Sequence, residues 1–229
     1  MFIHRRTKDG KFILRSATFD DTGQMETLQQ ICFPSLAKEE LLSKAHYVNH
    51  IKIFPEGQLV ILDGERVIAS SSNLRMHFPP ADHTFMEATD NLWITKTHLP
   101  DGEWLYQFDL GVLPQYRGLK LSRELYNAQQ ELARESGMKG QITAGMTIGY
   151  SKYKDLYSIR EYCEKLKSRE LTDPTVTPQL RAGFQWIKPI FNYVKDPTAG
   201  NCSILMAWPL EGISIEELIP HTGLFPGNK

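Results

Sequence analysis

The segment from Trp104 to Ser136 constrains the fold more than any other part of the chain. An apolar, aromatic stretch (Trp104–Val112) leads through a turn at 114–122 into a stretch that ends at Ser136-Gly137. Within that last stretch, apolar residues recur at the spacing of one buried helix face: Leu121, Leu125, Ala128 and Leu132. The pattern predicts a strand, a tight turn and a helix, in that order.

The turn is suited to holding a phosphate group. A helix that begins right after a tight turn has backbone N–H groups without intrahelical partners, and its dipole adds partial positive charge there. Arg117, Lys120 and Arg123 bring full positive charges to the same place. A second apolar run at 141–146 completes a β-α-β unit, and in open α/β sheets the ligand binds where such strands end.

Two common nucleotide-binding motifs are absent from the sequence. There is no G-x-x-x-x-G-K-[ST] loop and no G-x-G-x-x-G fingerprint. Nucleoside triphosphates and nicotinamide or flavin dinucleotides therefore lack their usual motifs here, which leaves coenzyme A high among the candidate ligands. The alternative is an ordinary strand-to-helix connection with two surface arginines.

The turn resembles the motif of the GNAT superfamily of acyl-CoA N-acyltransferases, a strand followed by P-x-Y-R-G-x-G-x-G/A and a helix. The chain reads Pro114-Gln-Tyr-Arg117-Gly118-Leu-Lys120-Leu-Ser122. This alignment places Lys120 at the central glycine and Ser122 at the last small residue. A register that begins at Gln115 keeps a central glycine but loses the spacing from Pro114. Glycine lets the backbone approach a pyrophosphate, whereas lysine can pair with a phosphate as a point charge.

The resemblance extends over nearly the whole chain, from about residue 12 to residue 209. The expected elements are a first strand at 12–18, helices at 26–32 and 38–51, a hairpin of strands at 58–62 and 67–71, and last strands at 185–194 and 202–208. The resemblance implies an α/β (α+β) fold. Its central sheet would be mixed and mostly antiparallel, with about six to seven strands, flanking helices and a splay between the fourth and fifth strands.

We interpret residues 1–229 as a single GNAT-type N-acetyltransferase domain. Insertions are expected at about 77–102 and 154–177, and a short C-terminal extension at 211–229 would contain a helix at 214–219. The segment at 150–177 is most similar to the acetyltransferase-type domain that is fused ahead of carbon-nitrogen hydrolases in some bacteria. The residues after Leu210 are too few for such a hydrolase.

Charge and composition limit the classes of partner. The net charge is −1, and 41% of the 229 residues are hydrophobic. Such a chain lacks the excess of positive charge that would attract nucleic acid or an anionic membrane. No apolar run approaches the roughly 20 residues of a membrane helix. Three cysteines far apart in sequence, with no signal-peptide pattern, favour a cytoplasmic protein. A homodimer is compatible with the sequence.

The resemblance implies acetyl-CoA as co-substrate and direct acetyl transfer to a small-molecule or peptide amine in a ternary complex. The cofactor-binding residues that it implies are Leu110, Gly111, Val112, Arg117, Gly118, Leu119, Lys120, Leu121, Ser122 and Arg123. Backbone amides near Val112 would bind the pantetheine arm and polarise the thioester carbonyl. Gly111 is consistent with a bulge there or with a simple bend.

A tyrosine after the fifth strand commonly protonates the departing thiolate in this superfamily. Tyr150, Tyr153 and Tyr157 share one face if their segment is helical. Tyr153 is the first choice of catalytic residue and Tyr150 the second, the alternative being that both rings pack at the edge of the core.

Asp109 is the candidate general base. Strand alternation directs it away from the substrate, unless a bulge resets the pattern. A buried Asp109 would have a raised pKa and can act as a base, or it can be a structural carboxylate. Glu103 is a further candidate, and deprotonation through water is the alternative to both.

No metal site is expected. His46 and His50 have the spacing of metal ligands on a helix, but the glutamate of H-E-x-x-H and a third ligand are missing. Three functional hypotheses follow: an acetyltransferase that acts on a primary amine, a non-catalytic CoA-binding or interaction module, and a subunit that acylates or regulates an amidase-type partner.

Overall fold

The computed structural model describes residues 2–78 and 82–215. The strands are β1 (His4–Arg6), β2 (Ile13–Ser16), β3 (Gln58–Asp63), β4 (Arg66–Met76), β5 (Trp104–Val112), β6 (Gly140–Met146), β7 (Gln185–Phe191) and β8 (Cys202–Pro209). The α-helices are α1 (Thr22–Cys32), α2 (Lys44–Ile53), α3 (Phe85–Ala88), α4 (Leu121–Glu135), α5 (Ile159–Lys167) and α6 (Val176–Arg181).

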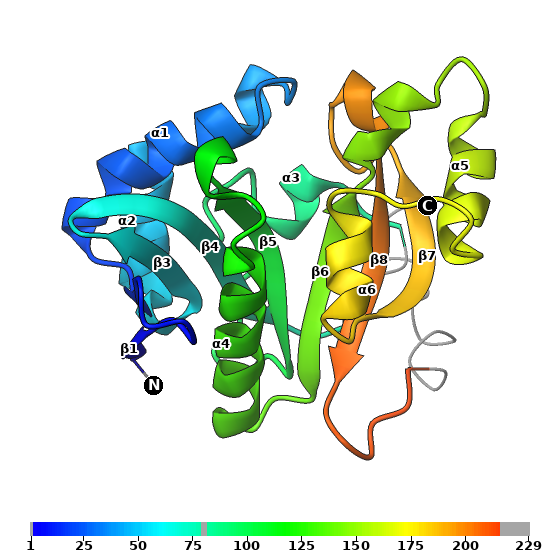
Figure 1. The fold of residues 1–229 in the computed structure, drawn as a ribbon. Helices are drawn as coiled ribbons and strands as arrows, with labels where there is room; N and C mark the ends of the chain where they lie inside the picture. Colours follow the sequence, from blue (N-terminus) through cyan, green and yellow to red (C-terminus); the bar gives the residue numbers. More distant parts are fainter. Residues whose placement is uncertain (1, 79–81, 216–229) are drawn as a thin grey trace.

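One eight-stranded sheet runs through the molecule in the order β1-β2-β3-β4-β5-β6-β8-β7. Only β5 and β6 pair in parallel, and their pairing ends at Gln107 with Thr143, although β5 continues to Val112 and β6 to Met146. The two strands diverge beyond that point (Figure 1). The predicted mixed, mostly antiparallel sheet and its splay are confirmed, and β1 is a strand that the sequence did not predict.

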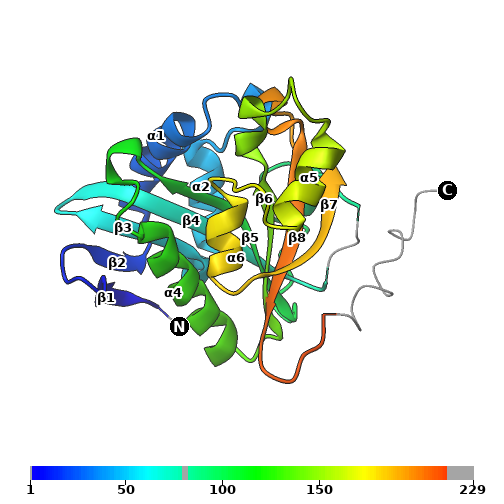
Figure 2. The ribbon, with the colours of Figure 1, turned by 45° about the vertical axis from the view of Figure 1, so that its right-hand side comes forward.

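Helices cover both faces of the sheet. In Figures 1 and 2, α4 and α6 lie in front of it and α2 lies behind. On β5, Leu105 packs in a small apolar cluster with Leu132 of α4. A side chain at Gly111 would instead meet Leu28 and Cys32 of α1. The strand β5 is therefore covered by α4 on one face near its start and by α1 on the other face near its end.

The helix predicted after the turn is confirmed. It spans Leu121–Glu135, and its apolar residues at the predicted spacing are all buried: Leu121, Leu125, Ala128 and Leu132. Gly137 follows with a φ of 66°, in the left-handed conformation that ends many helices. Burial of this apolar stripe against β5 and β6 fixes the position of the turn that precedes the helix.

The prediction of one helix over 38–51 is wrong. The segment forms a 3-10 turn at Lys38–Glu40 and, after a break, the helix α2. Ser43 causes the break because its side chain accepts a hydrogen bond from the N–H of His46 and so caps α2. The helix predicted at 214–219 falls almost entirely outside the described residues.

Asp173 connects the segment at 154–177 to the sheet. Its buried carboxylate accepts hydrogen bonds from the N–H of Gly149, just after β6 (2.8 Å), and from the hydroxyl of Tyr162 on α5 (3.0 Å). It also accepts from the N–H groups of Thr175 (2.7 Å) and Val176 (3.0 Å), where α6 begins. One side chain thus joins the end of β6 to two helices.

We expect Asp173→Ala to lower the free energy of unfolding by about 3 kcal/mol or more, because several buried donors lose their acceptor. Urea denaturation followed by circular dichroism measures the change. Asp155→Ala is the control, since Asp155 is exposed in the same segment and its loss should change stability by less than about 0.5 kcal/mol. Equal stability of the two variants would contradict the anchoring role.

Candidate functional site

The turn before α4 has two residues with positive φ. Gly118 has a φ of 84°, and Lys120, immediately before α4, has a φ of 61°. A side chain at Gly118 would meet nothing within 4 Å, so the backbone conformation rather than crowding favours glycine there. The left-handed conformation costs Lys120 about 1 kcal/mol. That conformation explains why the GNAT motif has glycine at this position, and it leaves an exposed ammonium beside the start of the helix.

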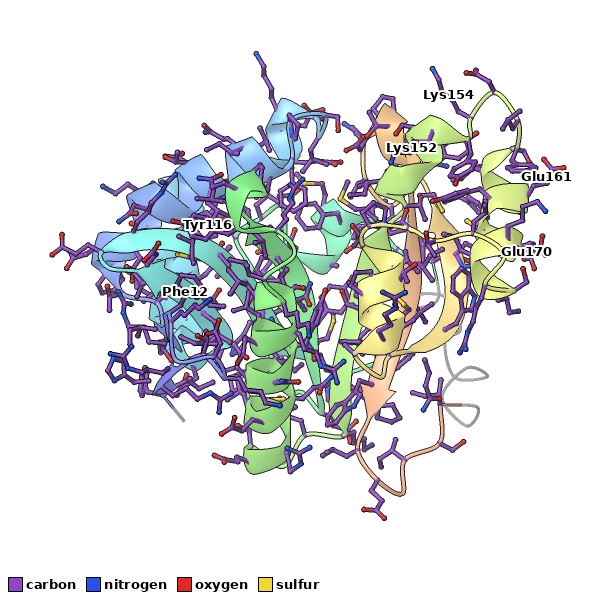
Figure 3. The ribbon with its side chains drawn as sticks, viewed as in Figure 1. Phe12, Tyr116, Lys152, Lys154, Glu161 and Glu170 are labelled. Carbon is purple, nitrogen blue, oxygen red and sulfur yellow. The ribbon has the colours of Figure 1, made fainter. Side chains whose placement is uncertain are left out.

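Tyr116 fixes the turn against the β3–β4 hairpin. Its hydroxyl donates a hydrogen bond to Asp63 (2.8 Å), and its ring packs edge-on against Phe12 with the centroids 6.0 Å apart (Figure 3). Arg117 follows, and its Nε donates to the carbonyl of Val112 (3.3 Å). The guanidinium is therefore held at the end of β5.

A cleft of about 410 Å³ opens where β5 and β6 diverge. Its turn side is formed by the turn and by Tyr126 of α4; its α1 side is formed by α1, the loop after it, Phe85 and the residues that follow β7. The expected cofactor-binding residues that line the cleft are Leu110, Gly111, Val112, Arg117, Gly118, Lys120, Leu121 and Ser122. Leu119 and Arg123 are not among the lining residues: Leu119 is exposed, and Arg123 donates to the carbonyl of Arg181.

A β-bulge at Phe108 determines which face Asp109 occupies. Gln107 pairs with Asn73 and Asp109 pairs with Ser72, so Phe108 is an extra residue in β5. Adjacent residues of β4 point to opposite faces of the sheet, and their partners do the same. Asp109 therefore points to the face opposite Gln107.

The bulge corrects the simple alternation expected from the sequence. Because of the bulge, Asp109 lies on the same face of the sheet as Tyr106, the face covered by α1. Under regular alternation, Phe108 would be on that face and Asp109 on the opposite one. The bulge lies at Phe108 and not at Gly111, where the sequence raised it as one of two options. Gly111 has a different role, since its missing side chain leaves room for Leu28 and Cys32.

Asp109 is a buried carboxyl group in the wall of the cleft. Its exposed fraction is 5%, and Tyr47 of α2 donates a hydrogen bond to its Oδ2 (3.1 Å). Burial raises the pKa of Asp109 to about 7, and the Tyr47 hydrogen bond opposes that rise. Near neutral pH this carboxyl group is poised to accept a proton.

Cys32 lies beside Asp109 on the α1 side. Burial, together with the charge of Asp109, raises the pKa of its thiol to about 11. The Sγ donates to the carbonyl of Val112 (3.3 Å). A thiol that stays protonated is a poor nucleophile, which agrees with a packing role.

Tyr193 is a lining residue that sequence reasoning missed. Its hydroxyl is hydrogen-bonded to Tyr106 (2.8 Å), which in turn is hydrogen-bonded to Nε2 of His83 (2.9 Å). Phe85 lies next to it, with its N–H bonded to the carbonyl of Tyr193 (2.8 Å). Tyr193 is 87 positions from Tyr106 and still further from His83 and Phe85, and no local pattern in the sequence connects them.

The condition under which Tyr150, Tyr153 and Tyr157 would share one helical face is not met, because their segment forms no α-helix. Residues Ile148–Lys152 make a short 3-10 helix. Tyr150 and Tyr153 both pack against Tyr162 of α5, with ring centroids 5.6 and 5.5 Å apart, and neither ring is among the residues that line the cleft.

The N–H of Gly149, in the first turn of this 3-10 helix, donates a hydrogen bond to the carboxylate of Asp173 (2.8 Å). The proton-donor role of Tyr150 or Tyr153 stays a prediction. Tyr126 of α4 is a tyrosine that does line the cleft, and burial raises the pKa of its hydroxyl.

The two histidines with metal-ligand spacing have other partners. His46 packs edge-on against Trp93, and Nε2 of His50 donates to the carbonyl of Leu92 (2.6 Å). Within residues 2–78 and 82–215, no three His, Cys, Asp or Glu side chains gather into a cluster that could hold a metal ion. In the same part of the chain, no helix has the length and apolar character required to cross a membrane.

The raised pKa of Asp109 predicts a pH-dependent effect of Asp109→Asn on stability. Folding shifts this pKa from its ordinary value of 3.8 to about 7, so ionisation opposes folding. The contribution of the neutral carboxyl group to the free energy of unfolding is fully present below pH 3.8. This contribution is lost as the pH rises from there through about 7. The advantage of the asparagine variant over the wild type should therefore grow by about 2.5 kcal/mol between pH 5 and pH 8.

Urea unfolding of both proteins at the two pH values measures that advantage. Asp155→Asn, at an exposed site, should show no such growth. A difference between Asp109→Asn and the wild type that does not change with pH would contradict the buried, titrating carboxyl group.

Comparison with known proteins places the chain in a family. No protein-family model matches it. The chain is 35% identical over 211 residues to the uncharacterized N-acetyltransferase YkwB of Bacillus subtilis, an alignment that covers 91% of this chain and 93% of YkwB. It is 34% identical over 201 residues to the probable hydrolase YhcX of the same organism, covering 86% of this chain but only 38% of YhcX.

Solved structures share the fold. The GphF GNAT-like decarboxylase in complex with isobutyryl-CoA has a TM-score of 0.72 at 18% identity, covering 86% of this chain and 99% of that one. The loading GNATL domain of CurA from Lyngbya majuscula has a TM-score of 0.74 at 16% identity, with coverages of 88% and 99%. YncA, a putative acetyltransferase from Salmonella typhimurium with its cofactor acetyl-CoA, has a TM-score of 0.55 at 10% identity, with coverages of 89% and 96%. With this fold, and with a relative 35% identical over nearly the full length of both proteins, the chain belongs to the GNAT superfamily of acyl-CoA N-acyltransferases.

Proposed function

We propose that the protein transfers an acetyl group from acetyl-CoA to a primary amine by direct attack in a ternary complex. The observation that carries the proposal is the buried carboxyl group of Asp109, which lines a cleft whose other side is the turn before α4. Membership of the GNAT superfamily supports an acyl-CoA co-substrate. So do the CoA ligands named for GphF and for YncA.

The turn supplies the groups that a CoA pyrophosphate needs. The first backbone N–H groups of α4 face the turn, and the exposed side chains of Arg117 and Lys120 add charge there. Leu110 to Val112 lie beyond the paired part of β5 and β6, so backbone groups on that edge can hydrogen-bond a pantetheine arm, apart from the carbonyl of Val112, which accepts from Arg117 and Cys32. The thioester is thereby led into the sheet beside Asp109.

Asp109 acts as the general base. An amine bound on the α1 side gives a proton to the carboxylate and attacks the thioester carbon. The N–C bond forms and the C–S bond breaks, with the electron pair leaving on sulfur, which then takes a proton. Tyr126 lines the cleft and is the donor that we propose to test first. Tyr150 and Tyr153 would have to leave their packing against Tyr162.

The cofactor site is tested by Gly118→Val. A valine at a φ of 84° distorts the turn that holds the pyrophosphate, so we expect acetyl-CoA affinity to fall by at least about tenfold in isothermal titration. Gly10→Val is the matched control, because Gly10 also has a positive φ (73°) and open space but lies outside the cleft. It should carry a similar strain and bind normally. A wild-type protein that binds no acetyl-CoA would refute the proposal.

The base is tested by the pH dependence of thiol release. We expect kcat/KM of the wild type to rise with an apparent pKa near 7, and Asp109→Asn to remove that rise and lower kcat/KM by at least about 100-fold. Tyr47→Phe removes a hydrogen bond that lowers the pKa of Asp109, so its profile should shift to higher pH. Tight acetyl-CoA binding without turnover of any amine would instead favour a non-catalytic CoA-binding module.

A further inference from the structure

The two sides of the cleft differ in charge. Among the described residues that line it, three carry an acidic or basic charge: Arg117, Lys120 and Asp109. Both cations belong to the turn, so the α1 side has a single charged group, a carboxylate. The remaining surface on that side is mostly apolar: Phe33, Leu36, Phe85, Phe108, Tyr193 and Val194.

The carboxyl group has capacity for a further donor. A carboxylate can accept several hydrogen bonds, and the side chain that donates to Asp109 is the hydroxyl of Tyr47. Gln29 of α1, 2% exposed, lines the same side, and its Oε1 has no hydrogen-bond partner among the described residues. A carboxylate and an unpaired amide oxygen are both acceptors, which suits a ligand group that only donates.

We propose that the acceptor is a primary monoamine with an apolar substituent, whose ammonium group binds at Asp109 while its aliphatic or aromatic part packs against the apolar wall. An ammonium group has three donors and no acceptor, which matches the groups of Asp109 and Gln29. This inference rests on the proposed acetyl transfer and narrows its substrate class.

The same lining disfavours acceptors with a second charge. A diamine would bury a second ammonium where the α1 side has no further carboxylate among the described lining residues. An amino acid would bring a carboxylate to a side without a cation, since Arg117 and Lys120 belong to the turn at which we propose that the cofactor binds. In both cases a charge loses its hydration without gaining a partner.

Proton transfer within this pair produces the nucleophile. The ammonium and the carboxylate become a neutral amine and a carboxylic acid, and an apolar environment favours the neutral pair over the ion pair. The amine nitrogen then bonds to the acetyl carbon, and the C–S bond breaks with its electrons on sulfur. The nitrogen loses its second proton and the thiolate gains one, so the products are a neutral amide and free CoA.

A matched series of six-carbon amines tests the inference. Hexylamine, 1,6-diaminohexane and 6-aminohexanoate have the same chain and the same primary amine, and differ only in a second charge. With acetyl-CoA as donor, thiol release should show that hexylamine is used with a kcat/KM at least about 30-fold above the values for the other two amines. A preference for the diamine or the amino acid would overturn the inference while leaving acetyl transfer intact.

Binding gives a readout that does not depend on turnover. Hexylamine titrated calorimetrically into the protein saturated with CoA should bind to the wild type and to Asp155→Asn, and at least about 30-fold more weakly to Asp109→Asn. If no amine is acetylated but this pattern appears, the proposed reaction fails and the monoamine site stands. If hexylamine binds equally to the wild type and to Asp109→Asn, the site is refuted.

A gain of specificity completes the test. Leu36→Glu adds a second carboxylate to the apolar wall and should raise the preference for the diamine over hexylamine, measured as the ratio of their kcat/KM values, by at least about tenfold. If this variant does not fold, Val194→Glu places the carboxylate on another part of the same wall. A folded variant with unchanged preference would show that the wall does not contact the acceptor chain.

Discussion

The arrangement of the cleft depends on the parallel pairing of β5 with β6, which ends before either strand does. β5 and β6 share pairing only as far as Gln107 and Thr143, and both strands then continue apart. Because a buried backbone group needs a partner, the diverging edges are suited to a ligand that can hydrogen-bond along them. The cleft, the position of the turn at its rim and the access of α1 to its other side all follow from this interruption.

The bulge at Phe108 lies at the start of the divergence. An extra residue bends a strand and increases its local twist, so the bulge is a physical cause for β5 turning away from β6 there. It also leaves Asp109 facing α1. Burial of the carboxyl group in that position raises the pKa of Asp109 to about 7, well above its ordinary value of 3.8.

Local features of the sequence predicted the turn and α4 well. The apolar spacing from Leu121 to Leu132 and the stop at Ser136-Gly137 are properties of neighbouring residues, and they settle both ends of that helix.

Asp109 was identified as a candidate, but the face of the sheet on which it lies was not predicted, since the bulge exists only relative to the pairing partner on β4. Gln29 and Tyr193 reach the cleft, and Tyr47 reaches Asp109, from distant parts of the chain, and no periodicity marks them. For Tyr150 and Tyr153 the sequence left a shared helical face open, and the structure has a short 3-10 helix at Ile148–Lys152 instead.

The two sides of the cleft are built from different parts of the chain, so substitutions can change one side without changing the other. The turn, α4 and the bulged strand form one unit, at which we propose that the cofactor binds. Apart from Phe108 and Asp109 of β5, the α1 side is assembled from side chains of α1, the loop after it, α3 and the loop after β7, which lie outside that unit. Substitutions at Leu36, Phe85 or Val194 would alter which molecule fits beside Asp109 and leave the cofactor cradle untouched. Acceptor choice can therefore drift among relatives while the fold and the donor stay the same.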